Sequence, residues 1–204
     1  MRQRGFNLIE LMVAMAILAF LMAAGMPSIG TWLDNTRIRN EGESIINGMQ
    51  TARAEAVRRN MNVSFWLVKL TNPAVLANDC SLLSTSGSWV VSVSNPENQC
   101  AADITSTDPT VNPAGVILGR PIGSDSARIS VDAKQSDGTT ASTFVTFNGF
   151  GRVASTTSIA TIALNGTGSG PYRNLQVVVT TTGAIRMCDP AVPNTGTDPR
   201  RCLQ

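Results

Sequence analysis

The 204-residue sequence contains no histidine, which removes the commonest general base and the commonest metal ligand together. It also lacks a Gly-x-Ser-x-Gly nucleophile motif and a glycine-rich phosphate-binding loop. Acids close in sequence, such as Asp132 and Asp137, fall in or beside a turn-like segment, where solvated carboxylates are the ordinary explanation. We therefore predict that this protein is not an enzyme and has neither a cofactor nor a metal site.

Charge is almost missing from the N-terminal part of the chain. Residues 6–26 form a 21-residue run with one charged side chain, Glu10. An α-helix of this length spans roughly 31 Å, at ~1.5 Å per residue, which is enough to cross a bilayer core. Arg2 and Arg4 precede the run, so the positive-inside rule places the N-terminus in the cytoplasm and the chain beyond residue 27 outside.

Glu10 distinguishes this run from an ordinary apolar segment. A secretory signal has a shorter apolar core, a small-x-small cleavage site and no carboxylate five residues into the core. A carboxylate in the hydrocarbon region costs roughly 2.5–3.5 kcal/mol on insertion scales, so it is retained when something pairs with it. A shallow Glu10 that reaches the membrane surface is the alternative.

Residues 5–11 read Gly-Phe-Asn-Leu-Ile-Glu-Leu. This segment resembles the class III signal of type IV pilins and type II secretion pseudopilins. The resemblance implies that a prepilin peptidase and methyltransferase cleaves between Gly5 and Phe6 and methylates the new N-terminal Phe6. It also implies that Glu10 pairs with the N-terminal amine of a neighbouring subunit in the filament, where two charges that are each costly in lipid become tolerable as a pair.

The same resemblance implies how the chain is divided and where it resides. A leader peptide over residues 1–5 precedes a transmembrane half-helix over 6–27. The expected location is the inner membrane, with a single pass and the remaining chain in the periplasm, before incorporation into an extracellular pilus. Other pilins of the filament are the implied partners.

Removal of the leader would leave the side chains without net charge. Arg2 and Arg4 account for two of the 16 Lys and Arg residues, so 14 would remain against 14 Asp and Glu. A balanced chain has no overall attraction for nucleic acid, and any such site must be local.

The four cysteines are not arranged in a Cys-x-x-Cys motif, which argues against a zinc site or a thioredoxin-like redox site. An even number in an exported chain favours disulfides, with free thiols as the alternative. Four cysteines allow three pairings, and their order favours Cys80–Cys100 and Cys188–Cys202. Each bond would close a loop of ~15–20 residues, which the chain-entropy estimate values at about 3 kcal/mol.

An amphipathic pattern continues the helix over residues 28–60. Charged residues fill most positions between apolar ones that recur at three- and four-residue spacings, namely Ile29, Trp32, Ile38, Ile45, Met49, Ala52 and Ala56. Such a stripe packs on another element, so Trp32 and Met49 are expected in core or filament packing. We predict a kink at Pro27, an end near Asn60 and a total length of about 80 Å.

The pattern changes to period two and β-branched residues from residue 62 onward. The predicted strands are Asn62–Leu70, Ser88–Ser94, Gly115–Gly119, Ala127–Lys134, Thr143–Asn148, Ile159–Asn165, Leu175–Thr181 and Ala184–Cys188. The segment 95–114 is expected to be an exposed loop, and the tail from Asp189 to be ordered mainly by the Cys188–Cys202 bond. We therefore predict an α+β chain with the type IV pilin fold, in which the long N-terminal helix packs on an antiparallel β-sheet or sandwich over residues 61–204.

Four later segments resemble one branch of the pilins. Residues 52–60 resemble the helix-end signature of the H-type (GspH) pseudopilin and FimT/FimU minor pilin family. Residues 88–91 resemble its glycine–tryptophan strand, with Ser88 in place of the glycine, and residues 147–152 and 183–188 match its C-terminal strands in spacing. The branch implies a low-abundance subunit that helps to initiate, prime or cap a filament.

Two assignments within this branch stay open. The ending from Cys188 to Cys202 looks more like the FimT/FimU minor pilins, and an H-type pseudopilin of a type II secretion system is the alternative. Some FimT members are linked to DNA uptake through a C-terminal Gly-Arg-x-Arg segment. This chain has Gly-Ala-Ile-Arg over residues 183–186 and so lacks the first arginine.

A local DNA site is nevertheless a hypothesis. Arg186, Arg200 and Arg201 would converge if the cysteine loop closes, with Arg173 as a further candidate. Guanidinium groups bind phosphates through paired hydrogen bonds, and three or four such contacts give weak, salt-sensitive binding of double-stranded DNA. The alternative is a solvated tail whose arginines balance its two aspartates, at positions 189 and 198.

Overall fold

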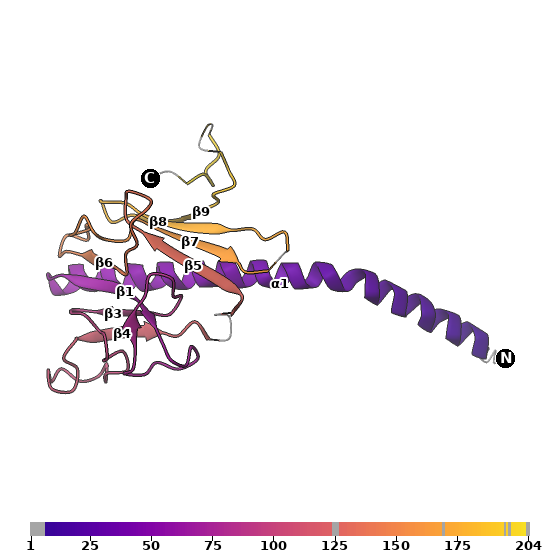
Figure 1. Cartoon of the computed structure of the whole chain (residues 1–204), viewed down its shortest axis with the longest axis horizontal. Helices are drawn as coiled ribbons and strands as arrows, with labels where there is room; N and C mark the ends of the chain where they lie inside the picture. The colour runs from indigo at the N-terminus through magenta and orange to yellow at the C-terminus, as the bar shows by residue number, and fades with distance from the viewer. Residues whose placement is uncertain (1–6, 124–126, 169, 194, 196, 203–204) are drawn as a thin grey trace, which may run out of the picture.

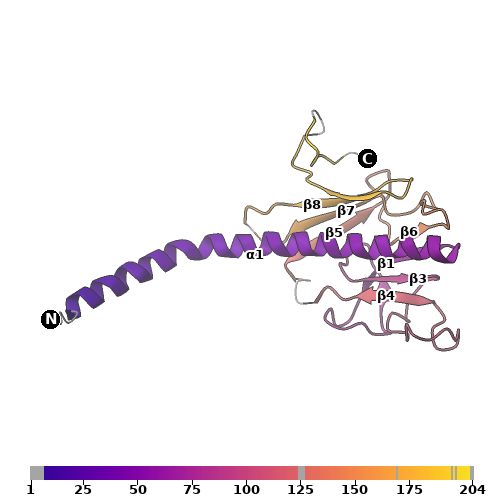
Figure 2. The same ribbon diagram turned by 180° about the vertical axis from the view of Figure 1, so that it is seen from behind.

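One long helix is the spine of the molecule. The computed structural model describes residues 7–123, 127–168, 170–193, 195 and 197–202. Helix α1 (Leu8–Arg59) has 52 residues and is therefore about 78 Å long. Its N-terminal half projects from the β-domain and curves gradually, whereas its C-terminal half lies within the domain (Figures 1 and 2). The helix continues unbroken through Pro27, where we predicted a kink.

Helix α1 ends where its sequence pattern predicts. Asn60 caps the C-terminus in the left-handed conformation, with φ 51° and ψ 42°. Asparagine tolerates this conformation better than most residues other than glycine. The N–H of Met61 donates to the carbonyl oxygen of Ala56 at 3.2 Å, which satisfies one of the carbonyl groups that a helix end leaves unpaired.

Two antiparallel sheets pack on the C-terminal half of α1, from different sides (Figure 1). In the first sheet, β1 is central and pairs with three of the other four strands. The strands of this sheet are β1 (Val63–Lys69), β2 (Ser81–Leu82), β3 (Trp89–Ser92), β4 (Val116–Arg120) and β6 (Phe144–Phe147). The second sheet has the order β5-β7-β8-β9, with β5 (Ile129–Lys134), β7 (Thr161–Gly166), β8 (Leu175–Val179) and β9 (Ile185–Cys188). Eight of these nine strands were predicted, and the two-residue strand β2 was not.

The main core lies between α1 and the two sheets. The predicted helical stripe is fully buried at five positions, which are Ile38, Ile45, Met49, Ala52 and Ala56. Strand β1 contributes Phe65 and Leu67 to the same core, and the second sheet contributes Ile162, Leu164 and Val177. Each fully buried large aliphatic side chain contributes about 1.5–3 kcal/mol by its removal from water.

Trp32 lies outside this core. Its side chain is 66% exposed, so it is not a core residue, and packing in a filament, the other expected role, stays a prediction. The side chain of Ile29, also predicted in the stripe, lies outside what the structure describes. The strands reach the helix only beyond this point, where the backbone N–H of Arg173 donates to Asn35 Oδ1 at 2.7 Å. Helical periodicity identifies the apolar face but not the length over which a sheet covers it.

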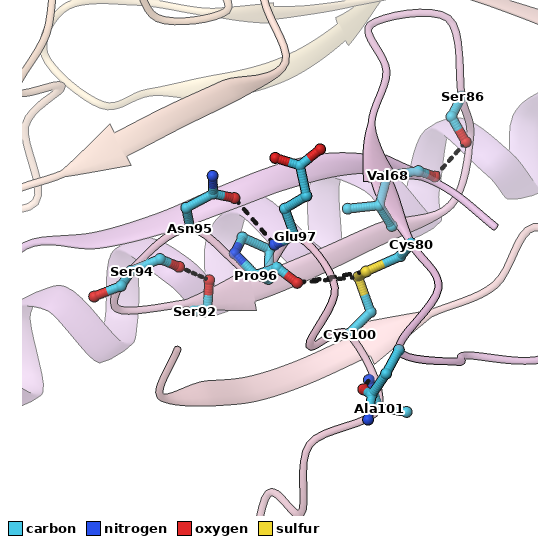
Figure 3. The surroundings of a disulfide bond; sticks show 11 residues. Val68, Cys80, Ser86, Ser92, Ser94, Asn95, Pro96, Glu97, Cys100 and Ala101 are labelled. Atoms are coloured by element: carbon cyan, nitrogen blue, oxygen red, sulfur yellow. Dashed lines mark hydrogen bonds between the residues drawn. A yellow bond between two sulfur atoms is a disulfide. The ribbon is translucent and has the colours of Figure 1, made fainter. Parts of the chain in front are cut away.

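A second, smaller core covers the far face of the first sheet. It contains Val68 and Val90 from the strands together with Cys80 and Cys100, which are disulfide-bonded (Figure 3). Segment 95–114 lies over this face and is less exposed than predicted, since Pro96, Cys100, Asn112 and Ala114 are buried. Asn112 bridges to the backbone of Val116 through both of its amide atoms, at 2.7 and 2.9 Å.

Candidate functional sites

The N-terminal site begins at the first turn of α1. The predicted cleavage position, Gly5 and Phe6, lies outside the described residues. Asn7 is the N-cap, with φ −82° and ψ 141°, and its carbonyl oxygen accepts the N–H of Glu10 at 3.0 Å. A carboxylate in the first turn interacts favourably with the positive end of the helix dipole.

Glu10 itself is exposed on the helix surface. Across the described part of the chain, no ion pair or hydrogen bond joins its carboxylate to another side chain. The helix therefore presents this carboxylate outward, where a positively charged group of another chain can reach it.

An apolar surface surrounds residues 8–22 of the projecting half of α1. Eleven large side chains are each more than half exposed, namely Leu8, Ile9, Leu11, Met12, Val13, Met15, Ile17, Leu18, Phe20, Leu21 and Met22. Soluble proteins rarely leave so large a contiguous apolar surface in water, so something outside this chain must cover it. Over the residues that the structure describes, no helical stretch combines the length and the apolar character of a membrane span.

The C-terminal tail folds back on the second sheet. Cys188, the last residue of β9, is disulfide-bonded to Cys202, and the N–H of Asp189 donates to the carbonyl oxygen of Arg200 at 2.8 Å. Both predicted disulfides are therefore present. The tail closes a hollow of about 240 Å³, lined by Arg173, Leu175, Met187, Cys188, Asp189, Pro199 and Arg200.

Two of the predicted DNA-binding arginines are paired with carboxylates of the same chain. Arg173 Nε lies 3.1 Å from Oδ2 of the nearly buried Asp189. Arg200 donates two hydrogen bonds to Asp198, from Nε to Oδ1 at 3.1 Å and from Nη2 to Oδ2 at 2.7 Å. This pairing holds the pKa of Asp198 at about 2, below its usual value, and raises the pKa of the Arg200 guanidinium.

The other two arginines, Arg186 and Arg201, are next in sequence to residues that line this hollow. Arg186 is on β9, opposite Val178 of β8, and Arg201 follows Arg200 and donates its N–H to the carbonyl oxygen of Asp198 at 3.3 Å. The structure thus brings Arg173 and Arg200 to one hollow, and a carboxylate of the same chain pairs with each guanidinium. The four arginines together with the two aspartates still carry a net positive charge.

A groove runs along α1 beside the second sheet. It has a volume of about 630 Å³, and its lining is mixed, with Trp32, Asn35, Thr36, Arg39, Glu43, Ile46, Arg173, Leu175 and Met187. Within the described ranges, no group of three cysteines and acids is placed to hold a metal ion.

One exposed aromatic residue was missed by the sequence analysis. Phe150 is 85% exposed at the tip of the loop after β6, and the sequence analysis gave it no role of its own. The glycines on both sides of it, Gly149 and Gly151, are the signal that indicates a turn there.

Comparison with known proteins assigns the chain to a family. Residues 41–183 match the family model described as type II transport protein GspH, and residues 1–26 match the prokaryotic N-terminal methylation motif. No curated protein matches the chain.

The fold is similar to that of a solved pilin. The crystal structure of the type IV minor pilin FimU of Pseudomonas aeruginosa in space group P21 matches with a TM-score of 0.50 and 15% identity, over 80% of this chain and 97% of that chain. A second crystal form, P65, gives a TM-score of 0.46 at 15% identity, over 76% and 97% of the two chains. At this identity the likeness concerns the fold, and the family match covers more than half of the sequence. The chain belongs to the GspH family of type IV pilin-like proteins, which includes the FimT and FimU minor pilins.

Proposed function

We propose that this protein is a minor type IV pilin that helps to initiate, prime or cap a pilus after removal of its leader. The observation that carries the proposal is the projecting half of α1, whose large apolar side chains are exposed and whose Glu10 lacks a partner in the described chain. A filament of bundled helices supplies both an apolar cover and a cation for Glu10.

The proposed sequence of events uses these features in order. The peptidase frees the amine of Phe6, and the helix waits in the inner membrane with the β-domain in the periplasm. Glu10 then pairs with the amine of an adjoining pilin as the helices associate, because each charge is costly in lipid alone and less so when paired. The loops of the β-domain determine which neighbours fit.

The Glu10→Ala variant tests the role of this carboxylate. We expect a processed and folded protein whose amount in sheared filaments falls on the order of tenfold, since a loss of ~1.4 kcal/mol changes an equilibrium by that factor. Glu43→Ala is the matched control, because Glu43 is on the same helix but already pairs with Arg39 at 2.8 Å. Wild-type incorporation of Glu10→Ala would rule out this role.

The Gly5→Ala variant tests the processing step separately. We expect the full-length precursor to accumulate, and mass spectrometry of the membrane fraction measures it directly. A normal mature mass would show that cleavage does not occur after Gly5.

The H-type pseudopilin is the second candidate, and the description of the matching family as a type II transport protein favours it. Deletion of the gene separates the two proposals. A minor pilin predicts loss of surface pili with secretion intact, and a pseudopilin predicts the reverse.

DNA binding by the tail is the third candidate, supported by the excess positive charge around the Cys188–Cys202 loop. A gel-shift titration of the detergent-solubilised chain with double-stranded DNA at two salt concentrations tests it. Binding that is lost in Arg186/Arg200/Arg201→Ala but retained in Arg39/Arg120/Arg128→Ala would locate the site. Absence of a shift at low salt would exclude it.

A further inference from the structure

The end of the β-domain nearest the projecting half of α1 carries two arginines. Strands β5 and β8 both begin on the side of the domain from which the helix emerges (Figures 1 and 2). Arg128, which precedes β5, has Nη1 4.0 Å from Asp34 Oδ2. The backbone N–H of Arg173, which precedes β8, donates to Asn35 Oδ1 at 2.7 Å. Both segments therefore contact α1 at neighbouring residues of one helical turn.

The charges at this end are arranged with guanidinium groups outward and carboxylates inward. The side chains of Arg128 and Arg173 are 62% and 57% exposed, whereas those of Asp34 and Asp189, which face them, are 13% and 10% exposed. Asp34 also pairs with Arg37 at 2.6 Å, so Arg128 adds a positive charge to this end. The hydrogen bond from Arg173 to Asp189 comes from Nε. Because a guanidinium has five N–H donors, both arginines keep donors for a further anion.

Trp32 lies on α1 beside these arginines. It lines the same groove as Asn35 and Arg173, and its indole is mostly exposed. Tryptophan has a large apolar ring and a polar N–H, and it is enriched where proteins meet the headgroup layer of a membrane. An exposed tryptophan next to outward guanidinium groups is therefore suited to a surface that is both apolar and negatively charged.

The length of the helix places Trp32 at the level of the lipid headgroups when the apolar run crosses a membrane. Residues 6–26 cover about 30 Å of hydrocarbon. Trp32 follows six residues after Met26, which is ~9 Å of helix, and the headgroup layer on each side is about 5–8 Å thick. Because helical side chains lean towards the N-terminus, the indole reaches back into this layer.

The two arginines are close enough to the same layer to contact it. Their attachment points on α1, Asp34 and Asn35, are only about 3–5 Å further along the helix than Trp32. An arginine side chain is long and flexible, and it places its charged end at a membrane surface while its stem stays on the protein. Basic side chains are attracted to anionic lipids within about one Debye length, ~8 Å at physiological salt.

We propose that this end of the β-domain rests on the headgroups of anionic phospholipids while α1 is in the membrane. Trp32 lies among the headgroups, and Arg128 and Arg173 bind lipid phosphates. The contact fixes the height and the orientation of the domain above the membrane before assembly. It rests on the membrane stage of the proposed function and adds to it a lipid partner, which involves neither leader processing nor Glu10.

Quenching of tryptophan fluorescence by brominated lipids tests the contact with the full chain in vesicles. Phosphatidylcholine vesicles contain the same small fraction of either brominated phosphatidylglycerol or brominated phosphatidylcholine, with the bromine near the top of the acyl chain. The difference between the wild type and Trp32→Phe isolates Trp32 from Trp66 and Trp89. We expect phosphatidylglycerol to be enriched at Trp32 on the order of fivefold over phosphatidylcholine. Equal quenching by the two lipids would overturn the proposal.

Arginine variants test which charges cause the enrichment. Arg128→Gln/Arg173→Gln should abolish it, and Arg128→Lys/Arg173→Lys should keep most of it because the charge remains. Arg58→Gln/Arg59→Gln is the matched control, since these two exposed arginines are in the last turn of α1, ~39 Å beyond Trp32, and should leave the enrichment unchanged. Enrichment that persists in Arg128→Gln/Arg173→Gln would overturn the role of the two arginines.

Alkaline extraction of the same vesicles reports on the proposed function separately. A chain that stays in the vesicles, but whose Trp32 is quenched by neither lipid, would overturn this inference and leave the membrane stage intact. A chain that alkali releases would overturn the membrane stage, and the lipid contact with it.

Discussion

The two halves of α1 belong to one continuous helix but have opposite relations to water. From Ile38 to Ala56 the apolar stripe is fully buried by the two sheets, whereas from Leu8 to Met22 the large apolar side chains are all more than half exposed. Both halves carry large apolar side chains on one continuous helix, so the difference in their burial arises from where the β-domain ends. The apolar side chains of the buried half are covered by the two sheets. Those of residues 8–22 are not covered by any described part of the chain.

The boundary between the halves is sharp. Trp32 is 66% exposed, and Ile38, less than two turns later, is fully buried. Between them, Asp34 Oδ2 lies 4.0 Å from Arg128 Nη1, and Asn35 Oδ1 accepts the backbone N–H of Arg173, so segments next to β5 and β8 meet the helix here. The domain therefore holds the helix firmly from its first point of contact.

Replacement of one methionine in each half of α1 tests the difference in burial and should give the largest change in the free energy of unfolding. Met49→Ala should lower the free energy of unfolding by about 2–5 kcal/mol, because Met49 is fully buried and its loss leaves a cavity. Met15→Ala, at a 64% exposed position, should change it by less than about 0.5 kcal/mol. Denaturation of the full chain in mild detergent, followed by tryptophan fluorescence, measures both. Equal losses would mean that the projecting half also packs on the domain.

Two glycines in tight turns test how the buried half of α1 is held. Gly183 has φ +83°, and a Cβ there would collide with the backbone oxygen of Gly151, which Arg53 of α1 binds. Gly183→Ala should therefore cost about 2–4 kcal/mol. Gly138 has φ +70° with nothing within 4 Å, so Gly138→Ala should cost only about 1 kcal/mol. If thermal unfolding gave equal costs, the contact between Gly183 and Gly151 would not hold the helix.

An exposed ion pair in the C-terminal tail, Arg200 with Asp198, is expected to give the smallest effect. The folded pKa of Asp198 is about 2, below the ordinary 3.8, chiefly because Arg200 binds it. A lowered carboxyl pKa stabilises the folded tail above pH about 4, and this contribution is lost as the pH falls through about 2. Arg200→Gln should raise the pKa of Asp198 towards 3.8, as measured by NMR titration.

Asp137 provides the internal reference for that titration. Its pKa is also about 2, but hydrogen bonds from Thr140 and Thr139 cause the shift, so the Arg200→Gln variant should leave it unchanged. A pKa of Asp198 that also stays near 2 would show that the backbone N–H of Arg200, and not its guanidinium, holds the carboxylate.

Local signals in the sequence predicted most of the fold. Period-two alternation located eight strands, and Asn60 marked the end of the helix, because both depend on neighbouring residues. The pairing of strands was not predictable in this way. Ser64 of β1 lies opposite both Ser92 and Thr146, and the second partner is 82 positions away in the chain.

The candidate sites also separate into those that a local sequence motif identifies and those that depend on the folded structure. Glu10 is recognisable because its motif is contiguous, and the structure adds only its exposure. The arginines of the tail were identified by residue type, but the carboxylates that balance Arg173 and Arg200 are a property of the folded tail. Phe150 was missed because exposure depends on what the rest of the fold leaves uncovered.

The continuity of α1 has a mechanical consequence. A pull on the N-terminal half runs along one hydrogen-bonded rod into the centre of the β-domain, so the domain is loaded in shear along the helix axis. For the rod to slide by one turn, all five buried side chains from Ile38 to Ala56 must leave their places together, and the large ones each resist by about 1.5–3 kcal/mol. The molecule is thus anchored against extraction by side chains spread along the whole buried half of the helix.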